Sequence, residues 1–510
     1  MNDHAEPHIH RGAITIAVML AALMQVIDMT IANVALPHMQ GSFGVSLDDI
    51  KLVLTFFIVA SAVATPAMGW LAERYGRRRV LLVCVSGFAM FSFMVGASTS
   101  FPEVVTARAM QGVFGSAFVP LAQAILLDTY PREKHGTAMA IFTLGVVVGP
   151  VLGPTVGGYI TEYYNWRWNF FINVPLGMIA LLMIWNFVPR QKRDRSRDFD
   201  LLGFVILGVG IGALQFMLDR GNAKNWFASP EIVGCAAAAF VLLWIYPWYA
   251  SLKKHPFVSL RLFRDRNYTL GSILMLLLGM VLLATVSLLP PFMQELLNFP
   301  VFTTGLILAP RGLGAMLAAI LVGRLITRVD PRLLILTGIV INVFALFELS
   351  RMTLQVDPFF IVWTGFLQGL GLGQVFVPLQ TVAFSTLPPE MRNEGTPIFN
   401  LIRNIGSSIG ISIVFTLLTR NTQINHAAIS ERFTVFSERL AQFLHLAPVK
   451  GGGAMMLLNE LVTGQAMMIS YNNDFLLMSG MMLLMLPIPL MMTYHYGNEI
   501  PGGKRSAAME

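Results

Sequence analysis

The 510-residue sequence is poor in charged residues and in cysteine. Asp, Glu, Lys and Arg together make up 12% of the chain, whereas a soluble domain carries about 25%. A soluble chain of this length needs a polar shell, and so few charges cannot supply one. The two cysteines, Cys84 and Cys235, lie in separate apolar stretches. The composition therefore excludes an ordinary soluble enzyme, a disordered protein and a disulfide scaffold.

The sequence also lacks the motifs of catalysis. It has no nucleotide-binding loop, no cluster with metal-ligand spacing and no nucleophile beside a general base. The glycine run 451–453 stands without a phosphate-binding context. We therefore expect no enzymatic activity, no metal and no cofactor. The net charge of +7 is typical of basic loops at a membrane, so we expect no nucleic-acid partner.

Long apolar runs dominate the sequence instead. Of the residues, 55% are hydrophobic. They gather into runs of about 16 to 27 residues, near the roughly 20 that one helix needs to cross a bilayer. We predict an all-α polytopic membrane protein with fourteen transmembrane helices. The expected spans are 13–36, 51–72, 80–97, 102–127, 136–160, 168–188, 199–218, 230–250, 268–292, 303–326, 332–349, 358–384, 394–418 and 474–494.

The distribution of basic residues predicts the orientation. With a cytoplasmic N-terminus, 23 of the 35 Lys and Arg residues fall in the cytoplasmic loops and tails, and only four fall in the short outer loops. Basic residues mark the cytoplasmic side. We therefore expect a multi-pass protein of the cell inner (cytoplasmic) membrane with both termini in the cytoplasm.

One outer connection, residues 419–473, is long. Within it, apolar residues recur at helical spacing and predict a short amphipathic helix: Phe433, Phe436, Leu440, Phe443 and Leu446. Such a helix could rest on the outer membrane surface or dock a periplasmic partner. The sequence leaves both interpretations open.

Two segments recur about 257 residues apart. The stretch from Gln111 to Gln123 resembles that from Gln368 to Gln380, and residues 69–77 resemble residues 323–332 at a similar offset. Each repeat falls on the same side of the membrane in both halves, which indicates a parallel repeat like that of the major facilitator transporters. We expect an N-terminal six-helix bundle over 1–188, two inserted transmembrane helices with flanking loops over 189–267, and a C-terminal six-helix bundle over 268–510 that includes the periplasmic loop 419–473.

Several motifs resemble those of the major facilitator superfamily, and in particular its fourteen-span drug:proton antiporters of the EmrB type. The first span reads D-x-T-x-x-N-x-A-L-P from Asp28, and the fourth reads R-x-x-Q-G from Arg108. The resemblance implies a conformational hinge in the fifth span and a cytoplasmic latch after the second. The hinge residues are Gly145, Gly149, Pro150, Gly153, Pro154, Gly157 and Gly158. The latch residues are Gly69, Glu73, Arg74, Gly76, Arg77 and Arg78.

A few charged side chains fall deep inside the expected spans. Burial of a charge in a bilayer is costly, so each should be paired or functional. We expect Asp28 and Arg108 to couple transport to protons, with a purely structural ion pair as the alternative. The substrate-binding candidates are Met24, Gln25, Met29, Asn33, Gln111, Gln123, Arg311, Gln368, Gln380 and Arg403. Arg311 and Arg403 could bind an anionic substrate group or fix helices.

The combined prediction is an exporter of lipophilic or cationic drugs that exchanges them for protons by alternating access. The alternatives are a dedicated exporter of one metabolite, such as an organic acid or a siderophore, and a membrane sensor that transports nothing. The expected partners are drug molecules, protons and the lipid bilayer. The resemblance further implies a periplasmic membrane-fusion adaptor and an outer-membrane channel.

Overall fold

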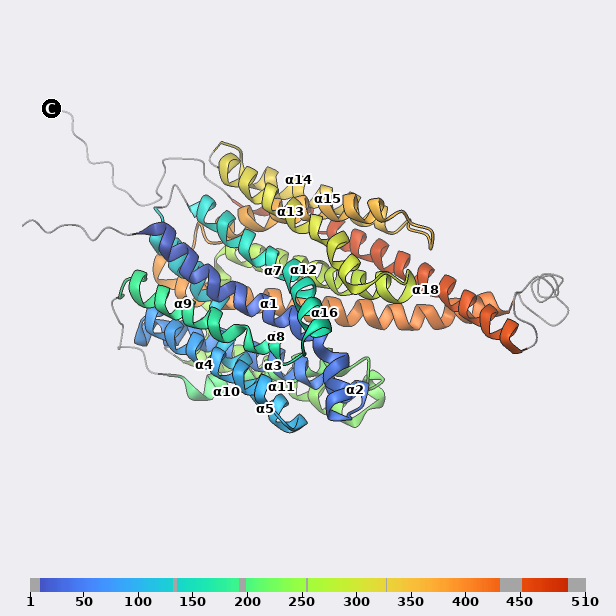
Figure 1. The fold of residues 1–510 in the computed structure, drawn as a ribbon. Coiled ribbons are helices and arrows are strands. Elements are labelled where there is room, and N and C mark those ends of the chain that lie inside the picture. Colours follow the sequence, from blue (N-terminus) through green and yellow to red (C-terminus); the bar gives the residue numbers. More distant parts are fainter. Residues whose placement is uncertain are drawn as a thin grey trace, which may run out of the picture.

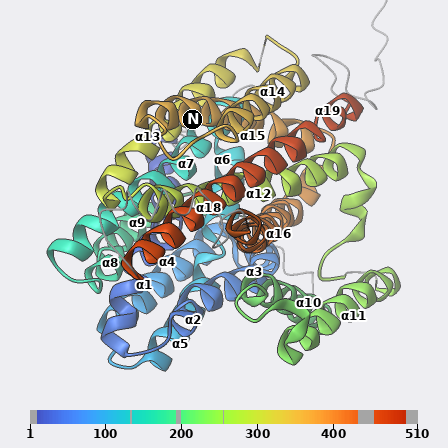
Figure 2. The same ribbon diagram turned by 90° about the vertical axis from the view of Figure 1, so that its right-hand side faces the viewer.

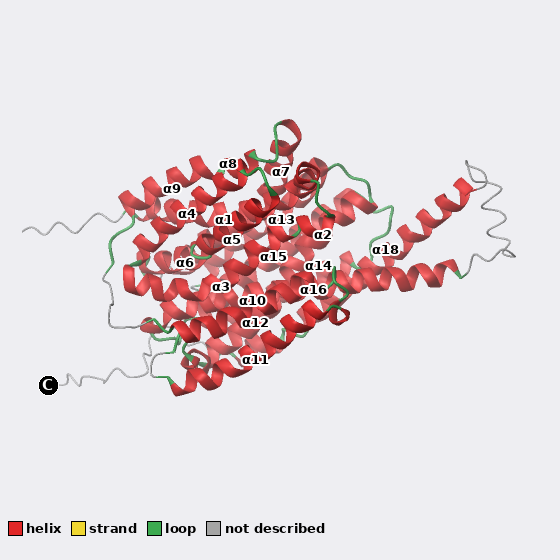
Figure 3. Cartoon of the chain, turned by 90° about the horizontal axis from the view of Figure 1, so that it is seen from below, coloured by secondary structure: helices red, strands yellow, loops and turns green. Residues whose placement is uncertain are grey.

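The computed structural model describes residues 10–131, 135–191, 199–253, 256–326, 328–431 and 452–493. Every regular element in these ranges is a helix (Figures 1 and 3). The first half contains α1 (Arg11–Phe43), α2 (Leu47–Ile50), α3 (Leu52–Tyr75), α4 (Arg77–Ala97), α5 (Phe101–Gly115), α6 (Phe118–Thr129), α7 (His135–Tyr163), α8 (Trp168–Phe171) and α9 (Asn173–Phe187). The inserted pair is α10 (Leu201–Arg220) and α11 (Pro230–Leu252), with the short helices η2 (Trp226–Ala228) and η3 (Leu260–Arg264). The second half contains α12 (Arg266–Pro291), η4 (Phe292–Leu296), α13 (Val301–Leu325), α14 (Pro331–Leu349), α15 (Pro358–Ala383), α16 (Pro389–Ser430), α18 (Gly452–Leu483) and α19 (Pro487–Met491).

The helices confirm the predicted fold class. Thirteen segments of the described chain are long and apolar enough to cross a membrane, and α7 occupies the remaining predicted span. The spans therefore lie where the apolar runs placed them. The observed helix ends differ more from the predicted ends, because helices continue past the apolar stretch.

Two glycines set helix ends through backbone conformations that other residues avoid. Gly44 ends α1 with φ of 62°, and its N–H donates to the carbonyl of Gln40. Gly76 separates α3 from α4 with φ of 88°. Both values lie in the region that favours glycine. The first helix thus extends seven residues past the predicted end at 36.

The predicted bounds of the loop over 419–473 are wrong at both ends. α16 continues to Ser430 and α18 begins at Gly452, so the two helices project together beyond the rest of the molecule (Figures 1 and 3). The projecting turns of α16 are polar, whereas those of α18 carry both apolar and polar residues, and Asn425 donates to Ser470 between them at 3.1 Å. The prediction placed one span of about 20 residues on each side of the loop and so missed the continuation of both helices. The predicted amphipathic helix around Phe433 and Phe443 lies outside the described residues.

The inserted helices bridge the two halves. Along one side of α10, Gly208 and Gly212 lie against Val63 of α3. On the other side, Ser412 of α16 donates to the carbonyl of Leu218 at 2.7 Å. Figure 2 shows α10 and α11 at the edge of the bundle, beside α3 and α16. The pair is therefore a brace across the two halves as well as an insertion between them in sequence.

The two halves share a buried apolar cluster near the end of the molecule that carries Arg11 and Thr493. There, Ala319 and Val322 of α13 and Val377 of α15 join a cluster built mainly from α1, α4 and α6. At the opposite end, the cluster around Met39 and Trp166 contains first-half residues alone among those described. The halves are thus packed together by apolar side chains at the terminal end.

Candidate functional site

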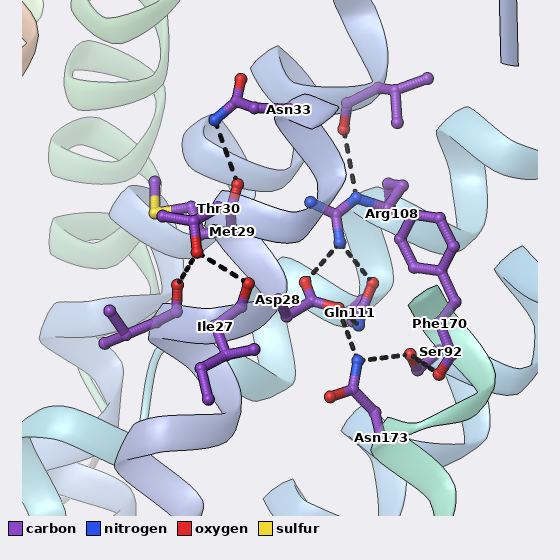
Figure 4. A network of polar contacts seen from close by, with 12 residues as sticks. Ile27, Asp28, Met29, Thr30, Asn33, Ser92, Arg108, Gln111, Phe170 and Asn173 are labelled. Carbon is purple, nitrogen blue, oxygen red and sulfur yellow. Dashed lines mark hydrogen bonds and ion pairs between the residues drawn. The ribbon is translucent and has the colours of Figure 1, made fainter. Parts of the chain in front are cut away.

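The carboxylate of Asp28 is the centre of a buried polar network (Figure 4). Asp28 lies near the middle of α1 and is 1% exposed. Its oxygens accept hydrogen bonds from Arg108 Nη1 at 2.6 Å, Gln111 Nε2 at 2.9 Å and Asn173 Nδ2 at 2.7 Å. These donors come from α5 and α9, so three helices meet at one carboxylate. The predicted pairing of Asp28 with Arg108 is present.

Arg108 is the fully buried cation of this network, with 0% exposure. Besides Asp28, it donates to Gln111 Oε1 at 2.7 Å and to the carbonyl of Val53 at 3.3 Å. Its guanidinium carbon lies 4.2 Å from the ring centroid of Phe57 and 5.5 Å from that of Phe170. Aromatic faces and an acid thus compensate for its lost hydration.

Two further polar residues support the carboxylate and were not assigned a role from the sequence. Asn173 also donates to Ser92 Oγ at 3.0 Å, and Ser92 donates to the carbonyl of Phe170 at 2.8 Å. Asn173 follows a short break between α8 and α9, in the stretch Phe171-Ile172-Asn173-Val174-Pro175-Leu176-Gly177, a motif that resembles the entry to the sixth span of the fourteen-span antiporters. That motif was the available signal for Asn173; no sequence pattern pointed to Ser92.

The glycines of the fifth span face the helix that carries Asp28. A Cβ at Gly149 would lie 2.5 Å from Val26, and one at Gly153 would lie 1.8 Å from Thr30 Oγ1. Both distances are too short for real atoms, so α7 can approach α1 only without these side chains. Gly145 and Gly157 make similar contacts with Met19 and Ile31. Pro150, Pro154 and Gly158 also lie within α7.

In the second half, α16 approaches α12 as closely as α7 approaches α1. The charged residues of this region are two arginines, Arg311 and Arg403. Gly406 and Gly410 of α16 lie against backbone carbonyls of α12, as α7 lies against α1. Arg311 of α13 is 9% exposed and donates to the carbonyl of Leu282 at 3.4 Å. Arg403 of α16 donates to Asn404 Oδ1 at 3.3 Å. In the described part of the chain, neither arginine has an acidic partner.

The substrate-binding candidates do not form one cluster. Gln111 belongs to the Asp28 network, and Met24 packs beside Gly177 of α9. Gln25, Met29 and Arg403 are half-buried, Gln368 is buried and Asn33 is exposed.

Gln123 and Gln380 meet each other across the two halves. Gln123 Nε2 donates to Gln380 Oε1 at 3.2 Å, and Asn400 donates to Gln123 Oε1 at 2.7 Å. The two glutamines hold the same position in the two sequence repeats. All three side chains are buried, with Gln123 in the middle of α6, Gln380 near the end of α15 and Asn400 in α16. Equivalent residues thus join the halves directly.

The residues predicted as a latch lie at the same end. Arg77 donates to the carbonyl of Ala124 at 3.0 Å and pairs with Asp128, both of α6. Arg78 stacks on Trp185 of α9, and Arg74 stacks on Trp70. Gly69 and Glu73 line a small cavity that Asp200 and Glu394 of the insertion and the second half also line. The Arg77 and Arg78 contacts therefore lie within the first half, while Glu73 lies where the three parts meet.

The equivalent loop of the second half differs. Asp330 replaces a motif glycine, accepts a hydrogen bond from the backbone N–H of Arg332 and so caps α14. Hydrogen bonds from the Arg332 guanidinium hold the pKa of the Asp330 carboxyl below its usual value.

Asp474 is a buried acid that the sequence reasoning missed as a site. It lies in α18 with 1% exposure, and its Oδ2 atom has no hydrogen-bond partner among the residues that the structure describes. Tyr471, one turn earlier, packs against Phe292. Asp474 is the first residue of the predicted last span, so from the sequence it resembles an acid at a helix end. Because α18 begins at Gly452, Asp474 lies inside the helix instead.

Comparisons with known proteins point to one family. Residues 18–411 match the model of the Major Facilitator Superfamily. The multidrug export protein EmrB of Escherichia coli K12 is 34% identical over 92% of this chain and 93% of its own. The fatty acid resistance protein FarB of Neisseria gonorrhoeae is 34% identical over 93% of this chain and 94% of its own. The crystal structure of the human organic anion transporter MFSD10 has the same fold, with a TM-score of 0.62 at 14% identity, over 95% of this chain and 100% of that one.

Proposed function

The chain belongs to the major facilitator superfamily and within it to the EmrB-type multidrug exporters, and from this premise we propose that it exchanges lipophilic or cationic drugs for protons. The observation that carries the proposal is the buried carboxylate of Asp28, held by three side-chain donors in the middle of a membrane helix. A charged side chain inside a membrane has a high cost in free energy, and such residues commonly have a function. Relatives named for multidrug export support the drug as cargo.

The proposed coupling is a competition for Asp28. When a proton binds the carboxylate, its attraction for Arg108 falls and the hydrogen bonds of the network rearrange. When the proton leaves, the carboxylate attracts Arg108 or a cationic drug. Proton and drug therefore exclude each other, which is the requirement for exchange in opposite directions.

The proposed movement is alternating access between the two halves. Gln123, Gln380 and Asn400 hold the terminal end together, and the glycine face of α7 gives a surface along which α1 can shift. The distribution of basic residues supports a cytoplasmic position for this end and an inner-membrane location for the protein. The described state is then closed toward the cytoplasm.

The test is transport into proteoliposomes with an imposed pH gradient. We expect a panel of lipophilic cationic dyes to accumulate with the wild type, and Asp28→Asn to abolish the dependence on the gradient. A matched control is Asp49→Asn, since Asp49 is an exposed acid of α2. If Asp28→Asn transports as the wild type does, the coupling role of Asp28 is wrong.

A dedicated exporter of an organic acid is the second candidate. It is favoured by Arg311 and Arg403, because neither has an acidic partner among the described residues. The relative FarB, named for fatty acid resistance, supports it as well. Competition between chemically unrelated dyes for transport would favour the multidrug exporter; transport of a single acid would favour the alternative.

We also propose that the hairpin of α16 and α18 contacts a periplasmic membrane-fusion adaptor that leads to an outer-membrane channel. The hairpin projects from the end opposite the termini, which in this orientation is the periplasmic side (Figure 1). Ile424, near the end of α16, is exposed on this projecting part. Crosslinking from a cysteine at Ile424, in cells, would identify a bound adaptor.

A further inference from the structure

We propose that a basic pocket between the beginning of α4 and the end of α9 binds the headgroup of an anionic membrane phospholipid. The pocket lies apart from the Asp28 network. The lipid would be a resident ligand on the outside of the bundle, so the inference goes beyond the proposed transport and does not depend on the cargo.

The first observation is a cavity lined by arginines. Its volume is about 90 Å³, whereas one water molecule needs roughly 10–15 Å³. The polar and aromatic residues of its lining come from the end of α3, the beginning of α4, the end of α9 and the chain just after it: Tyr75, Arg78, Arg79, Trp185, Arg190 and Gln191. None of the described residues that line it is acidic. The cavity therefore has the charge to attract an anion and room for more than a water molecule.

The second observation is that the protein leaves these positive charges unbalanced. Arg78 donates to the carbonyl of Trp185, and its guanidinium carbon lies 5.3 Å from the centroid of the Trp185 ring. Neither contact supplies a negative charge, and the charge of Arg190 repels that of Arg78. The acid beside the pocket, Asp128, pairs with Arg77 instead. A phosphate would supply the missing negative charge, because guanidinium groups bind phosphate oxygens through paired hydrogen bonds.

The third observation is the level of the pocket in the molecule. The ring of Phe187, at the end of α9, lies 6.2 Å from that of His10, so the pocket belongs to the end of the bundle that carries the termini. Trp185 and Tyr75 are both exposed beside it. Exposed Trp and Tyr side chains are typical of the boundary between headgroups and hydrocarbon. The pocket thus lies where a lipid presents its phosphate.

Apolar side chains lead away from the pocket along both helices. On α4, exposed apolar residues follow Arg79 at helical spacing: Val83, Met90, Phe93 and Met94. On α9, they precede Trp185 at the same spacing: Met178, Ile179 and Leu182. The two helices are neighbours (Figure 1), and Gly177 of α9 lies against Ala89 of α4. A lipid with its headgroup in the pocket can lay its acyl chains along these residues, whereas a soluble phosphate compound gains nothing from them.

The experiment measures ligand binding to the full-length protein in detergent by native mass spectrometry. The probes are dioctanoyl phosphatidylglycerol, dioctanoyl phosphatidylcholine and glycerol 3-phosphate. We expect the wild type to bind phosphatidylglycerol most tightly. Arg79→Gln and Arg190→Gln should each weaken that binding about fivefold, and the double variant about 25-fold, because each basic residue near an anionic lipid contributes a similar amount.

Two control variants separate a lipid site from general effects of charge and folding. Arg264→Gln removes an exposed arginine of η3 and should bind phosphatidylglycerol as the wild type does. Arg79→Lys combined with Arg190→Lys keeps both charges and should retain most of the binding. Because Arg79 and Arg190 are exposed, the unfolding temperature without lipid should be the same in every variant.

Four results would overturn the proposal. Unchanged binding in the double glutamine variant, or an equal loss in Arg264→Gln, would exclude the pocket as the site. A loss in the double lysine variant as large as that in the double glutamine variant would contradict recognition by charge. Equal affinities for the two lipids would contradict the selection of an anionic lipid. Binding of glycerol 3-phosphate as tight as that of phosphatidylglycerol would make the pocket a site for a soluble phosphate compound.

Discussion

At the scale of single residues, the main feature of the protein is a buried pair of opposite charges. Asp28 and Arg108 are buried together, and hydrogen bonds from Gln111 and Asn173 complete the carboxylate. Removal of one member leaves an uncompensated charge, which costs far more than removal of both. A pair that serves only structure should therefore tolerate joint replacement, whereas a pair that carries protons should not.

We predict strong coupling between Asp28→Asn and Arg108→Gln. Each single variant should lose about 3–5 kcal/mol of stability, and the double variant much less than the sum. The measurement is the unfolding midpoint in detergent, followed by pH-driven transport. Stability restored without transport supports proton coupling; transport restored in the double variant would make the pair structural. Additive losses in stability would contradict the network itself.

How much of the site could be predicted depended on the type of residue. Asp28, Arg108, Arg311 and Arg403 are conspicuous because a charge in an apolar run is rare. Ser92 is not, because hydroxyl groups occur throughout membrane helices and gain a role only from their neighbours in space. The sequence identified the charges, and the fold was needed to find what surrounds them.

At the scale of helices, small residues determine which pairs pack closely. Gly149 and Gly153 of α7 face α1, and Gly406 and Gly410 of α16 face α12 in the second half. Close backbone approach increases dispersion contacts in a bilayer, where the hydrophobic effect between helices is absent. The same faces allow sliding, because no side chain interlocks there.

We predict that Gly153→Ala separates α7 from α1. The added Cβ would lie 1.8 Å from Thr30 Oγ1, so the helices must move, at a cost of about 1–3 kcal/mol. Transport and the unfolding temperature should both fall. The matched control is Gly234→Ala on α11, where a Cβ meets nothing within 4 Å. Adding Thr30→Ala should restore part of the loss, and a silent Gly153→Ala would show that the face does not constrain the helices.

The helix ends were less predictable than the spans. Apolar runs mark the membrane-embedded part of each helix, so the fourteen spans were found from hydropathy alone. The projecting turns of α16 are polar, those of α18 carry exposed apolar residues such as Met456, and side chains join the two helices, as in the pair of His426 Nε2 and Asn459 Oδ1 at 3.0 Å. Such tertiary support leaves no hydropathy signal, so these turns were taken for a loop.

At the scale of the whole molecule, the sequence repeat becomes a direct contact. Gln123 and Gln380 occupy equivalent positions and bond to each other where the halves meet. The inserted α10 adds a second connection through α3 and α16. A change of access must break the first contact and deform or shift the second.

We predict that joining the halves at this contact stops transport. In a protein with Cys84 and Cys235 replaced by serine, Gln123→Cys and Gln380→Cys should react with a short, reducible bifunctional reagent. Dye transport should cease and return after reduction. The control is Asn425→Cys with Ser470→Cys, a pair at 3.1 Å within the hairpin of one half. Normal transport by the fully crosslinked Gln123–Gln380 pair would contradict a gate at this end.

The length of α16 has a mechanical consequence. From Arg403 to its end at Ser430 the helix is uninterrupted by proline, a length of about 40 Å at 1.5 Å per residue. A tilt of about 10° at the level of Arg403 would therefore displace the tip by roughly 7 Å. α16 would then act as a lever whose short arm begins at half-buried Arg403 and whose long arm ends at Ser430. A molecule bound near Ser430 would then bind one conformation of the bundle more tightly than the other. By reciprocity, its binding would shift the conformational equilibrium of the bundle.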